Sequence, residues 1–352
     1  MKIVSGIQPS GELHLGNYLG AVKNWINLQE DKNNSCLFFL ADLHSLTEGT
    51  SSAEDKKKQI EQLAIDLLAL GLDPKKCTLF IQSQVSEATE LAWFFNCVTP
   101  IGELGRMTQF KDKSSKQLGD VVNTGLLTYP ILMAADILLY KAEGVPVGDD
   151  QLQHLELTRE TARRFNRRFG EVFPEPKALL TRTVRLMSLK NPLEKMSKSS
   201  ENSYIGVFDE PKVIQDKIKA MATASNDLFD KISLGKEELI IEPSKKGKNN
   251  KDFPAMSAAV DNLFTLIREF NPLQYKSLFN GTEVDLEKLK YKEIKEVLGR
   301  AIVEYFAPFK AKREELMKDK KAVMKIYEEG AKKAREIAQV TMKEVKEKAG
   351  LI

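Results

Sequence analysis

Short apolar runs alternate with stretches of helical periodicity through the first half of the chain. Apolar residues recur every three or four positions after Asn17 and again over residues 55–70, which predicts two helices. Four short segments are predicted as strands: residues 2–5, 36–41, 78–82 and 145–148, of which residues 36–41 form a continuous apolar run typical of a strand buried on both faces. This alternation of strands and helices predicts an α/β fold with a doubly wound, Rossmann-like parallel sheet.

Polar residues follow each of the four predicted strands. In doubly wound sheets, ligands bind beyond the carboxyl ends of the strands. We therefore expect one binding edge to gather the polar strand-end residues Gln8, Ser10, Asp42, His44, Gln82, Gln84, Asp149 and Gln151.

The pattern changes after about residue 205. Apolar residues recur at helical spacing, as at Val260, Leu263, Phe264 and Ile267, strand signals fade, and long charged helices are predicted up to Gly350. We predict a catalytic domain over residues 1–204 and a helical domain over residues 205–352.

Composition narrows the class of protein without naming it. The 352 residues are 42% hydrophobic and 29% charged, as in ordinary globular proteins, and the length predicts two or three domains. No apolar run reaches the roughly 18 residues that span a bilayer, and the N-terminal segment is too short for a signal peptide. We expect a cytoplasmic protein that does not contact a membrane.

Cysteine usage and net charge exclude other classes. Cys36, Cys77 and Cys97 are widely spaced, so we expect buried reduced thiols without a disulfide framework or a zinc knuckle. We also expect no protein-bound metal or organic cofactor. The net charge of +3 is too small to indicate nucleic-acid binding by itself. Lysines are dense in the last fifty residues, but interleaved acidic residues fit a solvated helical surface equally well.

Residues 6–17 follow a predicted strand and open a predicted helix. Gly11 and Gly16 allow close approach of a ligand to the backbone, and a helix N-terminus attracts phosphate. His14 and Asn17 add side-chain donors. An ordinary strand–turn–helix with incidental glycines is the alternative reading of this segment alone.

Residues 195–199, Lys-Met-Ser-Lys-Ser, lie in a predicted loop. Two lysines and two hydroxyls in five residues can stay in contact with a polyphosphate as it separates from the α-phosphorus of a nucleotide. A solvated basic loop is the alternative when the segment is taken alone.

In this order, the two segments resemble the two signatures of class I aminoacyl-tRNA synthetases. Residues 9–17 are similar to the "HIGH" signature, with Asn17 where the second histidine usually stands, and residues 195–199 match the KMSKS signature letter for letter. Four further segments, residues 107–111, 126–130, 133–140 and 147–154, resemble the bacterial tryptophanyl-tRNA synthetases. This similarity is dense through residue 200 and looser in the helical tail.

The resemblance implies a tryptophan pocket. Asp136 would recognise the indole N–H beside an apolar wall of Met133 and Val145, and Tyr129 and Gln151 would contact the ammonium group. A site that pairs with a substrate N–H strongly rejects an analogue that lacks it. The remaining pocket residues are Gln8, His44 and Val4, the last standing where family members often have an aromatic residue. A surface carboxylate at Asp136 and a structural histidine at His44 are the alternatives.

The resemblance also implies an ATP site and its catalytic groups. Phosphate and nucleoside contacts would come from Gln8, Pro9, Ser10, Gly16 and Asn17, ribose contacts from Gly148, Asp149 and Asp150, and adenine contacts from the backbone of Leu186 and Met187. The KMSKS residues Lys195, Met196, Ser197, Lys198 and Ser199 would follow the phosphates. The catalytic residues would be Lys195, Lys198, Lys111, Asn17 and His14; for Lys111, an exposed surface lysine is the alternative.

By the same resemblance, the chain would activate L-tryptophan with ATP and Mg²⁺, and transfer the acyl group to the terminal adenosine of tRNA(Trp). A homodimer would form through an insertion at about residues 83–144, and residues 205–352 would read the anticodon. Three alternatives remain open: a tyrosyl-tRNA synthetase, a small-molecule nucleotidylyltransferase, and an inactive synthetase-like binding protein.

Overall fold

A computed structural model describes residues 1–47, 52–116, 122–180, 184, 186–197, 202–235 and 239–352. Those residues divide into two compact units, each treated by itself here. The first unit comprises residues 1–12, 21–183 and 313–352, and the second comprises residues 13–20 and 184–312.

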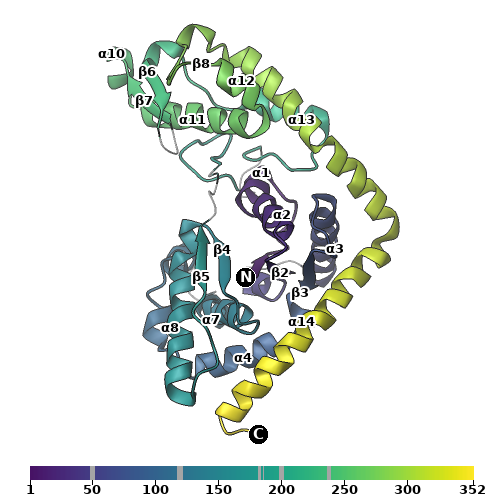
Figure 1. Cartoon of the computed structure of the whole chain (residues 1–352). Helices are drawn as coiled ribbons and strands as arrows, with labels where there is room; N and C mark the ends of the chain where they lie inside the picture. The colour runs from purple at the N-terminus through teal and green to yellow at the C-terminus, as the bar shows by residue number, and fades with distance from the viewer. Residues whose placement is uncertain (48–51, 117–121, 181–183, 185, 198–201, 236–238) are drawn as a thin grey trace. The chain divides into compact units, whose positions relative to one another are not determined.

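The first unit is built on a five-stranded parallel sheet in the order β3-β2-β1-β4-β5 (Figure 1). Its strands are β1 (Lys2–Ile7), β2 (Ser35–Leu40), β3 (Cys77–Ile81), β4 (Gly144–Val147) and β5 (Lys177–Leu180). The first four lie within two residues of the predicted runs, and the predicted doubly wound sheet is confirmed. The fifth strand was not predicted, because its four residues are partly exposed and do not form a buried apolar run.

Helices of the first unit connect and cover these strands. They are α2 (Lys23–Glu30), α3 (Ala53–Ala69), α4 (Glu87–Asn96), α5 (Ile101–Leu104), α6 (Thr108–Lys116), α7 (Thr124–Leu138), α8 (Leu152–Phe169) and α14 (Lys320–Lys348). The C-terminal α14 runs along β3 and also contacts α3 and α4 (Figure 1). Tyr327 and Ala334, on one face of α14, are completely buried.

Gly330 allows this close packing of α14. A Cβ at Gly330 would lie 1.8 Å from the backbone oxygen of Leu79 in β3, well inside van der Waals contact. The helix therefore lies against the strand backbone at this point, and only glycine fits.

The second unit combines helices with a small antiparallel sheet. Its helices are α1 (Leu15–Asn17), α9 (Pro211–Ala220), α10 (Lys245–Lys248), α11 (Phe253–Phe270), α12 (Pro272–Ser277) and α13 (Tyr291–Leu316), the last continuing past residue 312. Its strands, in the order β7-β6-β9-β8, are β6 (Phe229–Leu234), β7 (Leu239–Pro243), β8 (Phe279–Asn280) and β9 (Glu283–Val284). The prediction of a mainly helical region after residue 205 is confirmed, and the small sheet within it was not predicted.

The compact units also differ from the two predicted ranges, 1–204 and 205–352. Residues 13–20 pair with the second unit, where the Leu15 N–H donates to the Ile205 oxygen at 3.0 Å and the Val207 N–H donates to the Leu13 oxygen at 2.8 Å. Residues 313–352 join the first unit because the apolar face of α14 completes its core. Helical periodicity shows that a helix has an apolar face, but not which core that face joins.

Candidate active site

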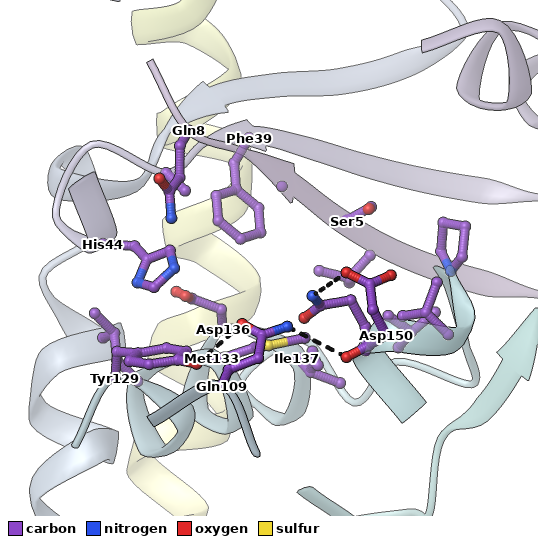
Figure 2. Close-up of a pocket in the computed structure, with 18 residues that line it drawn as sticks. Ser5, Gln8, Phe39, His44, Gln109, Tyr129, Met133, Asp136, Ile137 and Asp150 are labelled. Carbon is purple, nitrogen blue, oxygen red and sulfur yellow. Dashed lines mark hydrogen bonds between the residues drawn. The ribbon is translucent and has the colours of Figure 1, made fainter. Parts of the chain in front are cut away.

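The first unit contains a cavity of about 380 Å³ beyond the carboxyl ends of its strands. All eight residues predicted to bind tryptophan line it: Val4, Gln8, His44, Tyr129, Met133, Asp136, Val145 and Gln151. Figure 2 shows Gln8, Phe39 and His44 on one side, facing Tyr129, Met133 and Asp136 on the other. The volume falls in the range of small-ligand sites.

Helix α7 supplies one wall of the cavity. Tyr129, Leu132, Met133, Asp136 and Ile137 all line it, at spacings of three and four residues that place them on one helix face. Asn123 caps this helix by accepting from the Leu126 N–H at 2.9 Å.

Asp136 is the buried acid of the site, with 6% of its surface exposed. Its Oδ2 accepts a hydrogen bond from Gln82 Nε2 at 2.6 Å. Burial raises the pKa of this carboxyl well above its ordinary value; the Gln82 amide opposes that rise and the charge of Asp42 adds to it. A carboxylate held against an apolar wall is a strong acceptor for a ligand N–H.

Tyr129 is held in the cavity wall by hydrogen bonds to side chains of neighbouring elements. Its hydroxyl lies 2.9 Å from Nε2 of the buried His154 and donates to Gln109 Oε1 at 3.2 Å. Gln109 Nε2 in turn donates to the Asp150 oxygen at 3.2 Å. The Tyr129 and His44 rings lie 4.7 Å apart. These contacts fix the Tyr129 ring in the cavity wall.

Three further residues shape this site although none was assigned a binding role from the sequence. Gln109 and Phe39 line the cavity, and Gln82 supports Asp136 from behind it. Phe39 lies on β2 opposite Gly6 of β1, so an aromatic ring from the neighbouring strand lies in the same cavity as Val4. Gln82 carried a sequence signal in its position at a strand end, and Gln109 lies in residues 107–111, one of the segments that carry the family resemblance. Phe39 had no signal beyond its place in an apolar run.

The second unit holds the remainder of the first signature. His14 caps α1 by accepting from the Asn17 N–H on Nδ1 at 3.3 Å, while Asn17 Oδ1 accepts from the His14 N–H at 3.2 Å. When neutral, His14 then carries its proton on Nε2, which is the nitrogen able to donate. A Cβ at Gly16 would lie 2.9 Å from the His14 ring, so glycine is required for this arrangement.

Residues 186–197 of the second unit form a hairpin that ends in the second signature. The Met196 N–H donates to the Leu186 oxygen at 2.9 Å, and Met187 pairs with Lys195. Lys195 is exposed, and Met196 anchors the segment with only 3% of its surface exposed. Lys198 and Ser199 lie outside the described residues.

Asn262 of α11 holds the base of this hairpin, a contact that sequence reasoning missed. Its Oδ1 accepts from the Met187 N–H and its Nδ2 donates to the Met187 oxygen, both at 3.0 Å. The predicted adenine-contacting backbone at Met187 is thus already paired through its N–H.

The other predicted ATP residues are dispersed. Asp150 and Gln8 line the cavity, whereas Pro9, Ser10, Gly148 and Asp149 belong to the first unit but do not line it. Lys111 is exposed on α6, which is tied to the start of α8 by a 3.0 Å bond from the Thr108 N–H to Gln153 Oε1.

Neither a three-residue cluster of metal-ligating side chains nor a helix able to cross a membrane occurs within the described part of the chain.

Comparison with known proteins fixes the family. Residues 1–314 match the family described as tRNA synthetases class I (W and Y). A tryptophan–tRNA ligase of Caldanaerobacter subterraneus is 43% identical over 100% of this chain and 98% of its own length.

Two solved structures are similar over the whole chain. The tryptophanyl-tRNA synthetase of Mycoplasma pneumoniae is 35% identical with a TM-score of 0.81, covering 100% of this chain and 98% of its own. The Campylobacter jejuni enzyme, complexed with ADP and tryptophan, is 34% identical with a TM-score of 0.78 and covers 100% of both chains. The chain therefore belongs to the class I tRNA synthetase family of the tryptophan and tyrosine enzymes.

Proposed function

We propose that this chain is a tryptophan–tRNA ligase. It activates L-tryptophan with ATP, giving tryptophanyl-adenylate and pyrophosphate, and transfers the acyl group to the 3′-terminal adenosine of tRNA(Trp). One observation carries the proposal. The eight residues that were expected to bind the substrate tryptophan all line one cavity, and the acid Asp136 is buried in its wall. The relatives named tryptophan–tRNA ligases support the same substrate.

The cavity selects tryptophan through a polar and an apolar part. Indole has one donor, its N–H, and no acceptor, so Asp136 is its matching partner. Phe39, Met133 and Val145 offer apolar surface to the ring. Phenylalanine leaves Asp136 unpaired, and such a mismatch costs about 10⁴–10⁵ in specificity. Tyr129 and Gln151 lie at the same cavity to receive the ammonium group.

ATP enters with Mg²⁺ on its phosphates, and the ion neutralises part of their charge. The carboxylate of tryptophan attacks the α-phosphorus and pyrophosphate leaves, so no protein nucleophile is needed. Catalysis then depends on positioning and on stabilisation of developing charge. We assign phosphate contacts to the two signatures, with His14, Asn17, Lys195 and Lys198 as donors and Lys111 in support.

The other predicted ATP contacts remain part of this proposal. Gln8, Pro9, Ser10 and Gly16 serve the phosphates and nucleoside, and Gly148, Asp149 and Asp150 serve the ribose. Met196, Ser197 and Ser199 shape the signature segment, and the backbone near Leu186 and Met187 faces adenine.

The region after residue 205 is proposed to bind the anticodon arm of tRNA. Its lysines supply phosphate contacts, which are the main source of affinity for nucleic acid. We also propose a cytoplasmic location, where ATP and tRNA(Trp) are available.

A homodimer is proposed through the segment at about residues 83–144. Trp93 of α4 and Ile101 at the start of α5 are 69% and 74% exposed, although both are large and apolar. Exposed aromatic and aliphatic side chains close in sequence are typical of protein interfaces. Sedimentation of the wild type and of Trp93→Glu would test this: a dimer that becomes a monomer supports the assignment, and a monomeric wild type contradicts it.

ATP–pyrophosphate exchange with each amino acid, followed by charging of tRNA, tests the function. We expect exchange with tryptophan only, charging of tRNA(Trp), and loss of tryptophan-dependent exchange in Asp136→Ala. Exchange driven by tyrosine would instead identify a tyrosyl enzyme. Nucleotidyl transfer to another small molecule without charging would identify a nucleotidylyltransferase, and no reaction at all would identify an inactive relative.

A further inference from the structure

Gln82 lies directly behind the cavity and makes two oriented hydrogen bonds. It is the first residue after β3 and is 1% exposed. Its Nε2 donates to Asp136 Oδ2 at 2.6 Å, and its Oε1 accepts from the His44 N–H at 3.2 Å. Because a backbone N–H can only donate, the second bond fixes which end of the carboxamide faces Asp136. Gln82 therefore presents a donor to the acid.

A fixed donor has a defined effect on a buried carboxyl group. It favours the ionised form, in which both oxygens accept, against the burial that favours the protonated form. It also occupies Oδ2 and leaves Oδ1 as the acceptor for a ligand. The protonated form would carry its own O–H donor, which does not match the N–H donor of indole.

We infer that Gln82 is a positioning residue for tryptophan specificity, because it orients Asp136 and keeps it an acceptor for the indole N–H. This inference rests on the proposed function and on the proposed role of Asp136. Gln82 acts through Asp136 and does not line the cavity itself.

An analogue of tryptophan isolates this role. In 3-benzothienyl-alanine, sulfur replaces the indole N–H while the size and shape of the ring system are nearly kept. Calorimetry would give the dissociation constants of tryptophan and of the analogue for the wild type and for Gln82→Met. We expect the variant to bind tryptophan about 10- to 100-fold more weakly, in line with loss of a hydrogen bond to a charged group, and to bind the analogue within about twofold of the wild type.

Gln29→Met is the matched control. Gln29 is another buried glutamine of the first unit, with Nε2 donating to the Gly71 oxygen at 2.9 Å and Oε1 accepting from the Asp73 N–H at 3.0 Å, and it does not line the cavity. Its replacement removes comparable hydrogen bonds, so it should lower thermal stability without changing either dissociation constant. Should Gln82→Met give no folded protein, Gln82→Leu takes its place in the same measurements.

The pH dependence of kcat/KM for tryptophan gives a second readout. Loss of the donor raises the pKa of Asp136. The acid-side limb of the profile, where activity is lost as the pH is lowered, should therefore lie about one pH unit higher in Gln82→Met than in the wild type. Among the described residues, the other titratable groups that line the cavity or act on Asp136 include Asp42, His44, Tyr129, Tyr140 and Asp150, and the variant keeps all of them.

The outcomes separate the two proposals. Equal weakening of tryptophan and analogue, or an unchanged pH profile, would overturn the role of Gln82 while leaving the function intact. A wild type that does not prefer tryptophan over the analogue, or that shows no tryptophan-dependent exchange, would overturn the proposed function itself.

Discussion

Arg313 Nε donates to Asp66 Oδ1 across 2.7 Å, which joins the end of α13 to the last turn of α3. Asp66 is almost completely buried, with 2% of its surface exposed, and Gln62 Nε2 donates to the same oxygen at 2.8 Å. Burial raises the pKa of Asp66 above its ordinary value, and Arg313 opposes that rise. The hydrogen bonds from Arg313 and Gln62 therefore lower the free energy of keeping the buried Asp66 carboxyl ionised.

Arg313→Met should destabilise the protein by about 3 kcal/mol at neutral pH. Removing one partner of a buried ion pair costs roughly 3–5 kcal/mol, and the remaining Gln62 bond favours the lower end. Because the folded-state pKa of Asp66 is raised, folding binds a proton, and stability falls as pH rises between the unfolded and folded pKa values. Removal of Arg313 raises the folded-state pKa of Asp66 further. In mild acid the carboxyl is then protonated in the variant, so the loss of unfolding free energy caused by Arg313→Met should be smaller there than at neutral pH.

Urea unfolding at several pH values would measure this loss. Lys320→Met is the control, because Lys320 forms an ion pair with Glu61 in which the side chains are 47% and 29% exposed. That pair should contribute less than about 1 kcal/mol. Equal losses in the two variants, or a loss in Arg313→Met that grows in acid, would contradict the argument.

Gly330→Ala should destabilise the first unit by about 3 kcal/mol or more. Its Cβ would meet the Leu79 oxygen at 1.8 Å, and a backbone atom cannot turn aside as a side chain does, so α14 must shift from β3. Gly299→Ala is the counterpart in α13, where the nearest atoms would be at an ordinary 3.5 Å. That substitution should raise stability by up to about 1 kcal/mol through helix propensity. Thermal unfolding that ranks the two variants in the opposite order would refute the packing argument.

The central strands of the α/β sheet could be predicted because each one coincides with a short apolar segment of the local sequence. A continuous apolar run marks a strand buried on both faces, as at β2, and β1, β3 and β4 coincide with shorter apolar runs. Strand β5 and the strands β6 to β9 are short or partly exposed, so their pairing partners decide their conformation. The π-helical turn at Tyr18–Val22 also has no local signature.

The candidate site was predictable where residue type and family motif coincide, as at Asp136 and Tyr129. The supporting residues were not, because their roles arise from contacts between distant segments. Gln82 meets Asp136 54 positions away, and Asn262 meets Met187 75 positions away. A single sequence contains no record of such pairs.

Asn262→Ala should slow adenylate formation by about tenfold while leaving tryptophan binding unchanged. The variant loses both bonds to Met187, each worth about 1 kcal/mol, and the hairpin that carries Lys195 loses its fixed base. Rapid-quench measurement of adenylate formation and calorimetry with tryptophan would separate the two effects.

Asn226→Ala provides the comparison for Asn262. Asn226 Nδ2 also donates to two backbone oxygens of the second unit, those of Leu286 at 3.1 Å and Leu289 at 2.9 Å, neither of which belongs to the hairpin. Its loss should lower stability alone. If both asparagine variants slowed adenylate formation equally, general loosening of the unit would explain the result and the hairpin argument would fail.

Lys195→Ala should lower the rate of adenylate formation by about 10²–10³ while changing the affinity for ATP by less than about threefold. A donor aimed at charge that develops on the departing pyrophosphate acts in the transition state, and removal of such a donor has an effect of this size. Pre-steady-state pyrophosphate exchange and ATP binding would be measured side by side. Lys190→Ala serves as the control, because Lys190 is an exposed lysine of the same hairpin outside the signature. An equal loss of the rate of adenylate formation in both variants would show that Lys195 acts only as part of a general basic surface. A loss confined to ATP affinity would show that Lys195 binds ATP in the ground state and does not act in the transition state.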